Sequence, residues 1–126
     1  MIQEDDLPSV FRYVGGLVRS LSGIAFIVGG RPDHIHILST LPVTTDLSAY
    51  VRAIKANSSR WIKDLNPTYK GFSWQNGYGA FSVSESRKSF VVNYIKRQKE
   101  HHQKVSFEEE FLQFLKKNGC LQRNAE

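Results

Sequence analysis

The turn sequence GGRPD at residues 29–33 constrains the fold most, because it separates two short apolar segments. The segments are IAFIV, residues 24–28, and HIHILSTL, residues 34–41, and both have the length and composition of β-strands. Glycine and proline between two such segments favour a turn. We therefore expect residues 24–41 to form a β-hairpin, which Pro42 ends.

Helical patterns flank this hairpin. Apolar residues recur at helical spacing from Leu7 to Leu21, with Pro8 suited to the first turn and Gly23 to the end. Asp46 is expected to cap a second helix, which carries Tyr50, Ile54 and, further on, Ile62.

The second half of the chain begins with FSWQNGYGAFSVS, residues 72–84, which predicts a strand, a glycine-rich bend and a second strand. A helix is expected from about Ser86 to Gln103. Ser106 and Glu109 resemble a capping box for a last helix, which ends before Gly119.

The order of these elements predicts an α+β fold, an antiparallel sheet with helices packed on one face. The length of 126 residues suits a single domain over residues 1–126. No apolar run approaches the roughly 20 residues of a membrane span. The N-terminus is acidic, and Cys120 is the one cysteine. We therefore expect a cytoplasmic protein with no membrane partner.

Positive charge is concentrated in the middle of the chain. Residues 51–104 contain eleven Lys and Arg against three Asp and Glu, a net charge of +8, together with several aromatic residues. Cations interleaved with aromatic rings suit a nucleic acid, because phosphates need charge and bases need stacking partners. An ordinary basic surface over an aromatic core has the same composition, so both interpretations stay open.

His34 and His36 form an HxH pair inside the second strand. Side chains alternate along a strand, so both imidazoles face one side of the sheet and Ile35 and Ile37 face the other. Two imidazoles on one face suit a single cation, but they equally suit a solvated sheet face. A catalytic metal site needs a third ligand, and the candidates on the helix that follows are Gln98, Glu100, His101 and His102.

Tyr94 and Gln98 are four residues apart on that helix and therefore share one face. This spacing places a phenol beside a neutral oxygen ligand. A half-buried helix tyrosine with its hydroxyl in water fits the same spacing.

Taken together, RPDHIHIL, SSRWI followed by FSWQNGYGAFSVS, and VVNYIKRQKEHHQKVSFEEEF resemble the single-tyrosine HUH transposases of the IS-two-hundred type. The resemblance also extends to their relatives, the REP-associated tyrosine transposases, and covers nearly all of residues 7–119. It implies a ferredoxin-like or RRM-like HUH nuclease fold. Members normally begin with an extra strand before the first helix, and that first strand is missing here.

The resemblance implies an enzyme that cleaves and rejoins single-stranded DNA or a DNA hairpin in transposition. Tyr94 would be the nucleophile and would form a 5′-phosphotyrosine. His34, His36 and Gln98 would bind Mg²⁺ or Mn²⁺. Basic residues would bind the DNA backbone, and the candidates are Arg52, Lys55, Arg60, Lys63, Lys96 and Arg97. A homodimer is expected, with each site combining the histidines of one subunit and Tyr94 of the other.

Two other functions compete with this one. The first is a decayed or domesticated relative that binds single-stranded or hairpin DNA without cleaving it, which the missing strand favours. The second is an unrelated RNA-binding α+β sandwich that uses Trp61, Trp74 and Tyr78 for stacking. The second alternative gives no role to the HxH pair or to the spacing of Tyr94 and Gln98.

Overall fold

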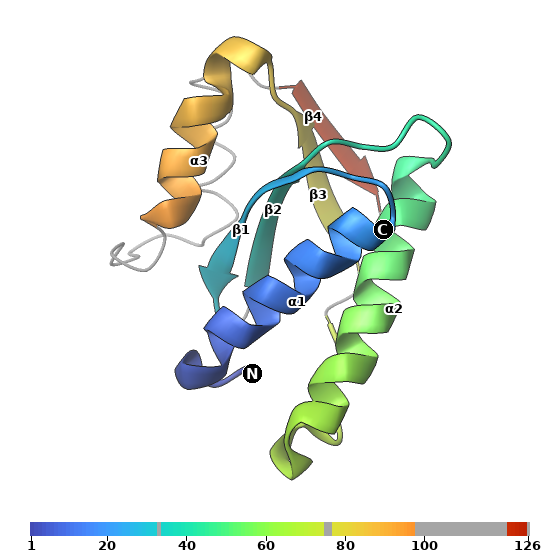
Figure 1. Cartoon of the computed structure of the whole chain (residues 1–126), viewed down its shortest axis with the longest axis vertical. Helices are drawn as coiled ribbons and strands as arrows, with labels where there is room; N and C mark the ends of the chain where they lie inside the picture. Colours follow the sequence, from blue (N-terminus) through green and yellow to red (C-terminus); the bar gives the residue numbers. More distant parts are fainter. Residues whose placement is uncertain (33, 75–76, 98–120, 126) are drawn as a thin grey trace. The chain divides into compact units, whose positions relative to one another are not determined.

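The computed structural model describes residues 1–32, 34–74, 77–97 and 121–125 of the chain (Figure 1). The backbone divides into two compact units, Met1–Gln75 and Asn76–Glu126. We call them the N-terminal and the C-terminal unit and describe each by itself.

The N-terminal unit is an α+β arrangement of two helices and an antiparallel hairpin. A short 3-10 helix, η1 (Glu4–Asp6), leads into α1 (Leu7–Ser20), and strands β1 (Ala25–Arg31) and β2 (His34–Ser39) follow. Helix α2 (Leu47–Leu65) and a second 3-10 helix, η2 (Pro67–Tyr69), complete the unit. Helix α1 lies across the hairpin and α2 runs beside α1 (Figure 1). The predicted α+β fold with helices packed against an antiparallel sheet is confirmed.

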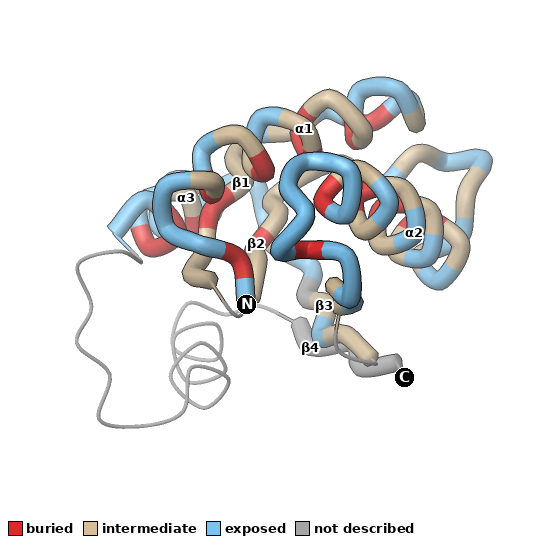
Figure 2. Tube along the Cα trace, turned by 90° about the horizontal axis from the view of Figure 1, so that it is seen from below, coloured by how far each residue is buried: buried red, intermediate tan, exposed pale blue. Residues whose placement is uncertain are grey.

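The core of this unit forms where α1 and α2 meet the hairpin. The buried positions of α1 include Val10, Val14 and Val18, which recur every four residues and therefore form one stripe (Figure 2). Ile54 and Ile62 form the matching stripe on α2. Further buried members of the core are Ile2, Leu7, Tyr50 and Tyr69.

Helix α1 ends close to Gly23, as predicted, but Ser22 and not the glycine takes the left-handed conformation, with φ of 70°. The Gly23 N–H donates to the Val18 carbonyl at 2.9 Å. A Cβ on Gly23 would lie 2.9 Å from the Tyr50 hydroxyl and 3.0 Å from Val18 Cγ1. Glycine is therefore required here for close packing rather than for an unusual φ.

The second helix begins as predicted. The Asp46 carboxylate accepts a hydrogen bond from the Ala49 N–H at 2.7 Å, which satisfies one of the free donors at the helix start. Ser58 is buried in the middle of the helix, where its hydroxyl donates to the Ile54 carbonyl at 2.6 Å.

The first strand of the hairpin extends further toward the turn than the sequence predicts. Arg31 pairs with His34, so the connection shrinks to two residues, and Gly29 and Gly30 belong to β1. Gly30 has φ of +142°, and a Cβ there would overlap the backbone of His34 and Ile35. Glycine thus permits the two strands to approach each other closely at Gly30, a position that the sequence pattern assigns to the turn.

A bulge interrupts β1 near its start. Ala25 pairs with Ser39 and Ile27 pairs with Leu38, so Phe26 is an extra residue in the first strand. On both sides of Phe26 the ladder is antiparallel and the pairs directly oppose each other.

The prediction of a strand at the beginning of residues 72–84 is wrong. Phe72 and Trp74 lie in an irregular segment, and only β3 (Tyr78–Ser82) is a strand. The rings of Phe72 and Trp74 meet edge to face with centroids 5.0 Å apart, and both pack against the core. The alternation of aromatic and polar residues suggests a strand. Here the same residues form an irregular backbone segment that buries two aromatic rings.

The C-terminal unit contains a second hairpin and a helix. Strand β3 pairs antiparallel with β4 (Leu121–Ala125), which the sequence did not predict. A 3-10 helix, η3 (Glu85–Arg87), precedes α3 (Lys88–Lys96). The predicted helix therefore starts two residues later than expected. Residues 98–103 of that prediction, the predicted last helix, and Cys120 lie outside the described residues.

Candidate functional site

His34 and His36 lie on β2 with their rings close together. The two ring centroids are 5.2 Å apart and the rings meet edge to face. Ile35 and Ile37 pack against the core, so the histidines occupy the opposite face of the hairpin, as predicted. His36 is 9 % exposed, and the Nε2 atoms of both rings are shielded from solvent. The alternative of a solvated sheet face is therefore wrong for His36.

This environment keeps His36 neutral. Burial, reinforced by the neighbouring His34 ring, lowers the pKa of His36 from 6.5 to about 3. At neutral pH the ring is therefore uncharged and keeps a nitrogen lone pair, as a metal ligand requires.

Two residues of β1 lie directly opposite the two histidines of β2. Gly29 pairs with His36, and Arg31 pairs with His34. The Arg31 guanidinium lies 3.8 Å from a carboxylate oxygen of Glu4. The sequence pattern did not indicate that Arg31 pairs with His34, because this pairing depends on the two-residue length of the connection.

Tyr94 lies on α3, in the C-terminal unit. It is 8 % exposed and shares one helix face with the buried Val91 and Ile95. Tyr94 is thus buried rather than half-buried. Gln98, the expected third ligand, lies outside the described residues, as do Glu100, His101 and His102.

The donor set can be compared with the expected metal. Within the described residues, no group of three or more His, Cys, Asp or Glu side chains converges on one point. Two adjacent imidazoles, one of them held neutral, fit part of the ligand set of a divalent ion, and imidazole suits Mn²⁺ better than Mg²⁺. Metal binding by His34, His36 and Gln98 stays a prediction.

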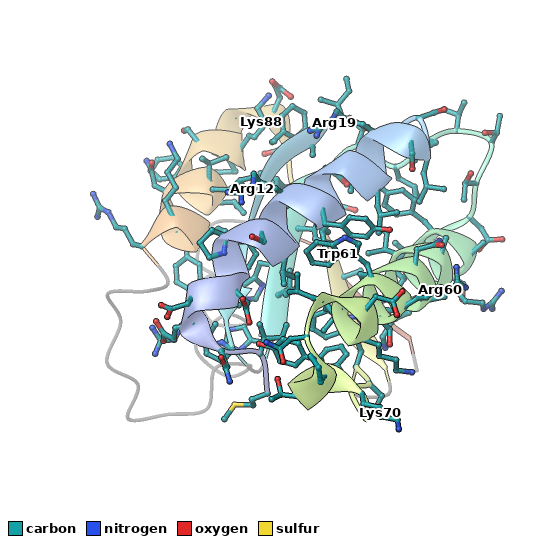
Figure 3. The ribbon with its side chains drawn as sticks, turned by 60° about the horizontal axis from the view of Figure 1, so that its bottom comes forward. Arg12, Arg19, Arg60, Trp61, Lys70 and Lys88 are labelled. Atoms are coloured by element: carbon teal, nitrogen blue, oxygen red, sulfur yellow. The ribbon has the colours of Figure 1, made fainter. Side chains whose placement is uncertain are left out.

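The predicted DNA-binding residues fall on two helices. Arg52, Arg60 and Lys63 are exposed on α2 and Lys55 is partly exposed, and all four avoid the buried stripe of that helix. Arg60 points away from the core in Figure 3. Lys96 and Arg97 are exposed at the end of α3. Contact with DNA at these positions stays a prediction.

Two of the aromatic residues considered for base stacking are engaged within the N-terminal unit. The Trp61 ring stacks on Tyr13 between α2 and α1, with centroids 4.5 Å apart and planes 10° from parallel (Figure 3). The Trp74 indole N–H donates to the Ser58 hydroxyl at 3.0 Å. These contacts account for both tryptophans as packing residues, which removes the main support for an unrelated RNA-binding sandwich.

The N-terminal segment is fastened to the rest of its unit by polar contacts. The Tyr69 hydroxyl donates to an Asp6 carboxylate oxygen at 2.6 Å and accepts from the Gln3 N–H at 2.8 Å. The Ile2 N–H donates to the Pro32 carbonyl at 3.2 Å. Burial and the bond to Asp6 raise the pKa of Tyr69. Residues 2–6 are thus held beside the turn that leads into His34.

A comparison with protein families gives one match. The family described as "Transposase IS200 like" matches residues 3–98, a span that includes both histidines and Tyr94. No curated protein and no solved structure gives a significant match. In the described part of the chain, no helix is both long enough and apolar enough to cross a bilayer.

Proposed function

Because the chain belongs to the IS200-like transposase family, its function is related to DNA transposition, and we propose that it cleaves and rejoins single-stranded DNA through Tyr94. The observation that carries this proposal is the pair of adjacent imidazoles at His34 and His36, one of them buried and neutral. A structural strand has no need for two such groups side by side. A site for a divalent ion beside a phosphodiester can use them as two of its ligands.

The proposed reaction conserves the energy of the phosphodiester bond. The Tyr94 oxygen attacks the scissile phosphorus, so a tyrosyl O–P bond forms while the P–O3′ bond breaks. The phenolic proton leaves to solvent or a nearby base, and the departing O3′ takes up a proton. Rejoining reverses these steps when a 3′-hydroxyl attacks the 5′-phosphotyrosine. No nucleotide hydrolysis is required.

His34, His36 and Gln98 would hold Mg²⁺ or Mn²⁺. When bound, such an ion supplies polarisation of the phosphate oxygens and offsets charge in the transition state. The neutral state of His36 at physiological pH suits this role, because a protonated imidazole cannot ligate. The exposed cations of α2, with Lys96 and Arg97, would bind the DNA backbone.

We further propose that the active form is a homodimer in which each site combines His34 and His36 of one subunit with Tyr94 of the other. The family resemblance supports this arrangement. The serine-rich segment SVSES, residues 82–86, joins β3 to α3 and would allow the helix to dock on a second subunit.

The test uses single strands from the genomic flanks of the gene itself, incubated with the protein and Mn²⁺. We expect a covalent protein–DNA adduct on a denaturing gel, lost in Tyr94→Phe, which removes one hydroxyl and should leave DNA binding nearly intact. Adduct formation by Tyr94→Phe would show that another tyrosine is the nucleophile. Binding of single strands with no adduct under any condition would instead favour a relative that grips DNA without cleaving it.

A further inference from the structure

Phe90 is a large apolar side chain that α3 exposes to solvent, one helical turn before Tyr94. It is 49 % exposed, whereas Tyr94 is 8 % exposed. Residues four apart are neighbours on the surface of a helix. The Phe90 ring therefore starts beside the helix face that carries the proposed nucleophile, about 6 Å away along the helix axis.

A cation lies against this exposed ring. The guanidinium carbon of Arg87 is 5.8 Å from the centre of the Phe90 ring, which is the geometry of a cation–π contact. Arg87 is exposed, and the carboxylate of Glu85, two residues away, forms its ion pair with Lys88 at 2.9 Å. The cation–π contact thus orders an aromatic ring that remains about half exposed.

The surroundings of Phe90 on the helix are polar and cationic. Phe90 shares one exposed stripe of α3, at spacings of three and four residues, with Asn93 and Arg97. Residues 86–97 contain four Lys and Arg and no Asp or Glu. A cationic helix with one ordered, exposed ring is complementary to a single strand of DNA, whose phosphates need positive charge and whose bases each offer a face for stacking.

We propose that Phe90 stacks on the nucleobase next to the phosphate that Tyr94 attacks. The inference rests on the proposed function and adds a base-binding residue to that site. The separation of one helical turn suits this role, because a base attached beside the scissile phosphate is within reach of the ring. Stacking tolerates every base, so Phe90 would position the strand for attack rather than read its sequence.

A purely structural role of the ring predicts different results. An exposed cation–π contact stabilises its helix slightly, so its loss should lower the melting temperature without involving any particular nucleotide. Stacking makes binding depend on one base. It also predicts that loss of the ring lowers the affinity without changing its salt dependence, because no contact with a phosphate is lost.

The experiment measures binding of a labelled single strand from the flank of the gene to the full chain carrying Tyr94→Phe, which removes the hydroxyl that would form the adduct. We expect Phe90→Leu to weaken binding about tenfold and to leave the slope of log Kd against log salt unchanged. Phe90→Trp should retain the affinity, since it keeps an aromatic ring. Arg97→Gln, on the same stripe, should instead reduce that slope by about 0.7.

Replacing one nucleotide at a time by an abasic residue identifies the stacked base. At one position the abasic strand should lose about tenfold in affinity for the chain with Phe90 and little for Phe90→Leu. With Tyr94 restored, the length of the released strand locates the cleaved phosphate, and the coupled position should adjoin it. Coupling at a distant nucleotide would contradict the placement of the ring.

The matched control is Phe26→Leu, the same substitution at a ring of the N-terminal unit that is 39 % exposed. This variant should keep the full loss of affinity at the abasic position that is coupled to Phe90. If Phe26→Leu removed that loss as Phe90→Leu does, the effect would not be specific to α3 and the inference would be wrong.

The outcomes separate this inference from the proposed function. If the Tyr94→Phe chain binds no single strand, the proposed function fails and Phe90 loses its role with it. If that chain binds but no abasic position is coupled to Phe90, only the present inference is wrong. A shift of Phe90→Leu from dimer to monomer in sedimentation, with every abasic position equally tolerated, would assign the ring to subunit packing. Melting temperatures of all variants detect a folding defect, and a loss confined to one nucleotide cannot arise from one.

Discussion

The imidazole rings of His34 and His36 stand edge to face, with centroids 5.2 Å apart, and a proton on one ring disfavours a proton on the other. Burial adds to this effect at His36, whose pKa falls from 6.5 to about 3. The folded state therefore favours the neutral form of both imidazoles, and lowering the pH reduces the stability of the folded state at this position.

We expect the free energy of unfolding to fall as the pH is lowered from 6.5 towards 3. In this range the unfolded chain binds a proton at His36 and the folded chain does not, so the stability is fully present above pH 6.5 and is lost below it. At pH 5, about 1.5 units below the unfolded pKa, the loss is about 2 kcal/mol. Urea unfolding at pH 7 and pH 5, with EDTA present, measures it.

The control for this prediction is His36→Gln, which keeps a polar side chain of similar size without a titrating nitrogen. Its stability should change less between pH 7 and pH 5 than that of the original chain. Equal losses in both proteins would mean that other groups cause the acid sensitivity.

A divalent ion should stabilise the folded chain. We expect Mn²⁺ to raise the melting temperature, since a ligand that binds only the folded state at 100 times its Kd adds about 2.7 kcal/mol. His34→Ala and His36→Ala should lose this effect, and Gln98→Ala should weaken it. Calorimetry with and without EDTA measures the shift and does not depend on activity. A shift that survives both histidine substitutions would place the ion elsewhere.

Tyr69→Phe should destabilise the N-terminal unit by about 1 kcal/mol, because one part-buried hydroxyl serves both Asp6 and the Gln3 N–H. The folded state holds the phenolic proton more tightly than the unfolded state, so the advantage of tyrosine should shrink above about pH 10. Denaturant titrations at pH 8 and above pH 10 test both points. The reference variant is Tyr13→Phe, whose hydroxyl makes neither of these bonds. Equal stability of Tyr69→Phe and Tyr69 proteins at pH 8 would contradict the assignment.

Mixing two inactive variants tests the shared site. Tyr94→Phe keeps the histidines, and the double variant His34→Ala/His36→Ala keeps the tyrosine. If sites are shared, heterodimers should regain one working site and carry adduct only on the chain without histidines. If each site forms within one chain, no mixture should cleave, even where subunit exchange is demonstrated independently.

Local signals predicted the helices of the N-terminal unit and the hairpin correctly. Pro8 and Asp46 mark helix starts through backbone rules that need no distant partner. The same rules failed where packing or pairing decided the outcome. Trp74 follows an irregular path because Ser58 and the core bind its ring, and β4 forms because it pairs with β3, about 40 residues earlier. The periodicity of apolar residues in the sequence reveals neither side-chain packing nor pairing with a distant strand.

The same limit applies to the candidate site. The alternation of HIHI placed both histidines on one face, which the structure confirms. The depressed pKa of His36 and the pairing of Arg31 with His34 depend on burial and on register. A turn assigned to all of GGRPD hid this register, because Gly29 and Gly30 act as strand residues.

The bulge at Phe26 has a consequence for how the length of this hairpin can drift in evolution. The pairs on either side of Phe26 are already in register, so loss of this one residue would leave a regular ladder with both histidines on their present face. Loss of a residue between Ile27 and Arg31 would move part of β1 to the wrong side of the sheet. We therefore expect a single-codon deletion scan across β1 to recover folded protein at position 26 and to fail closer to the turn.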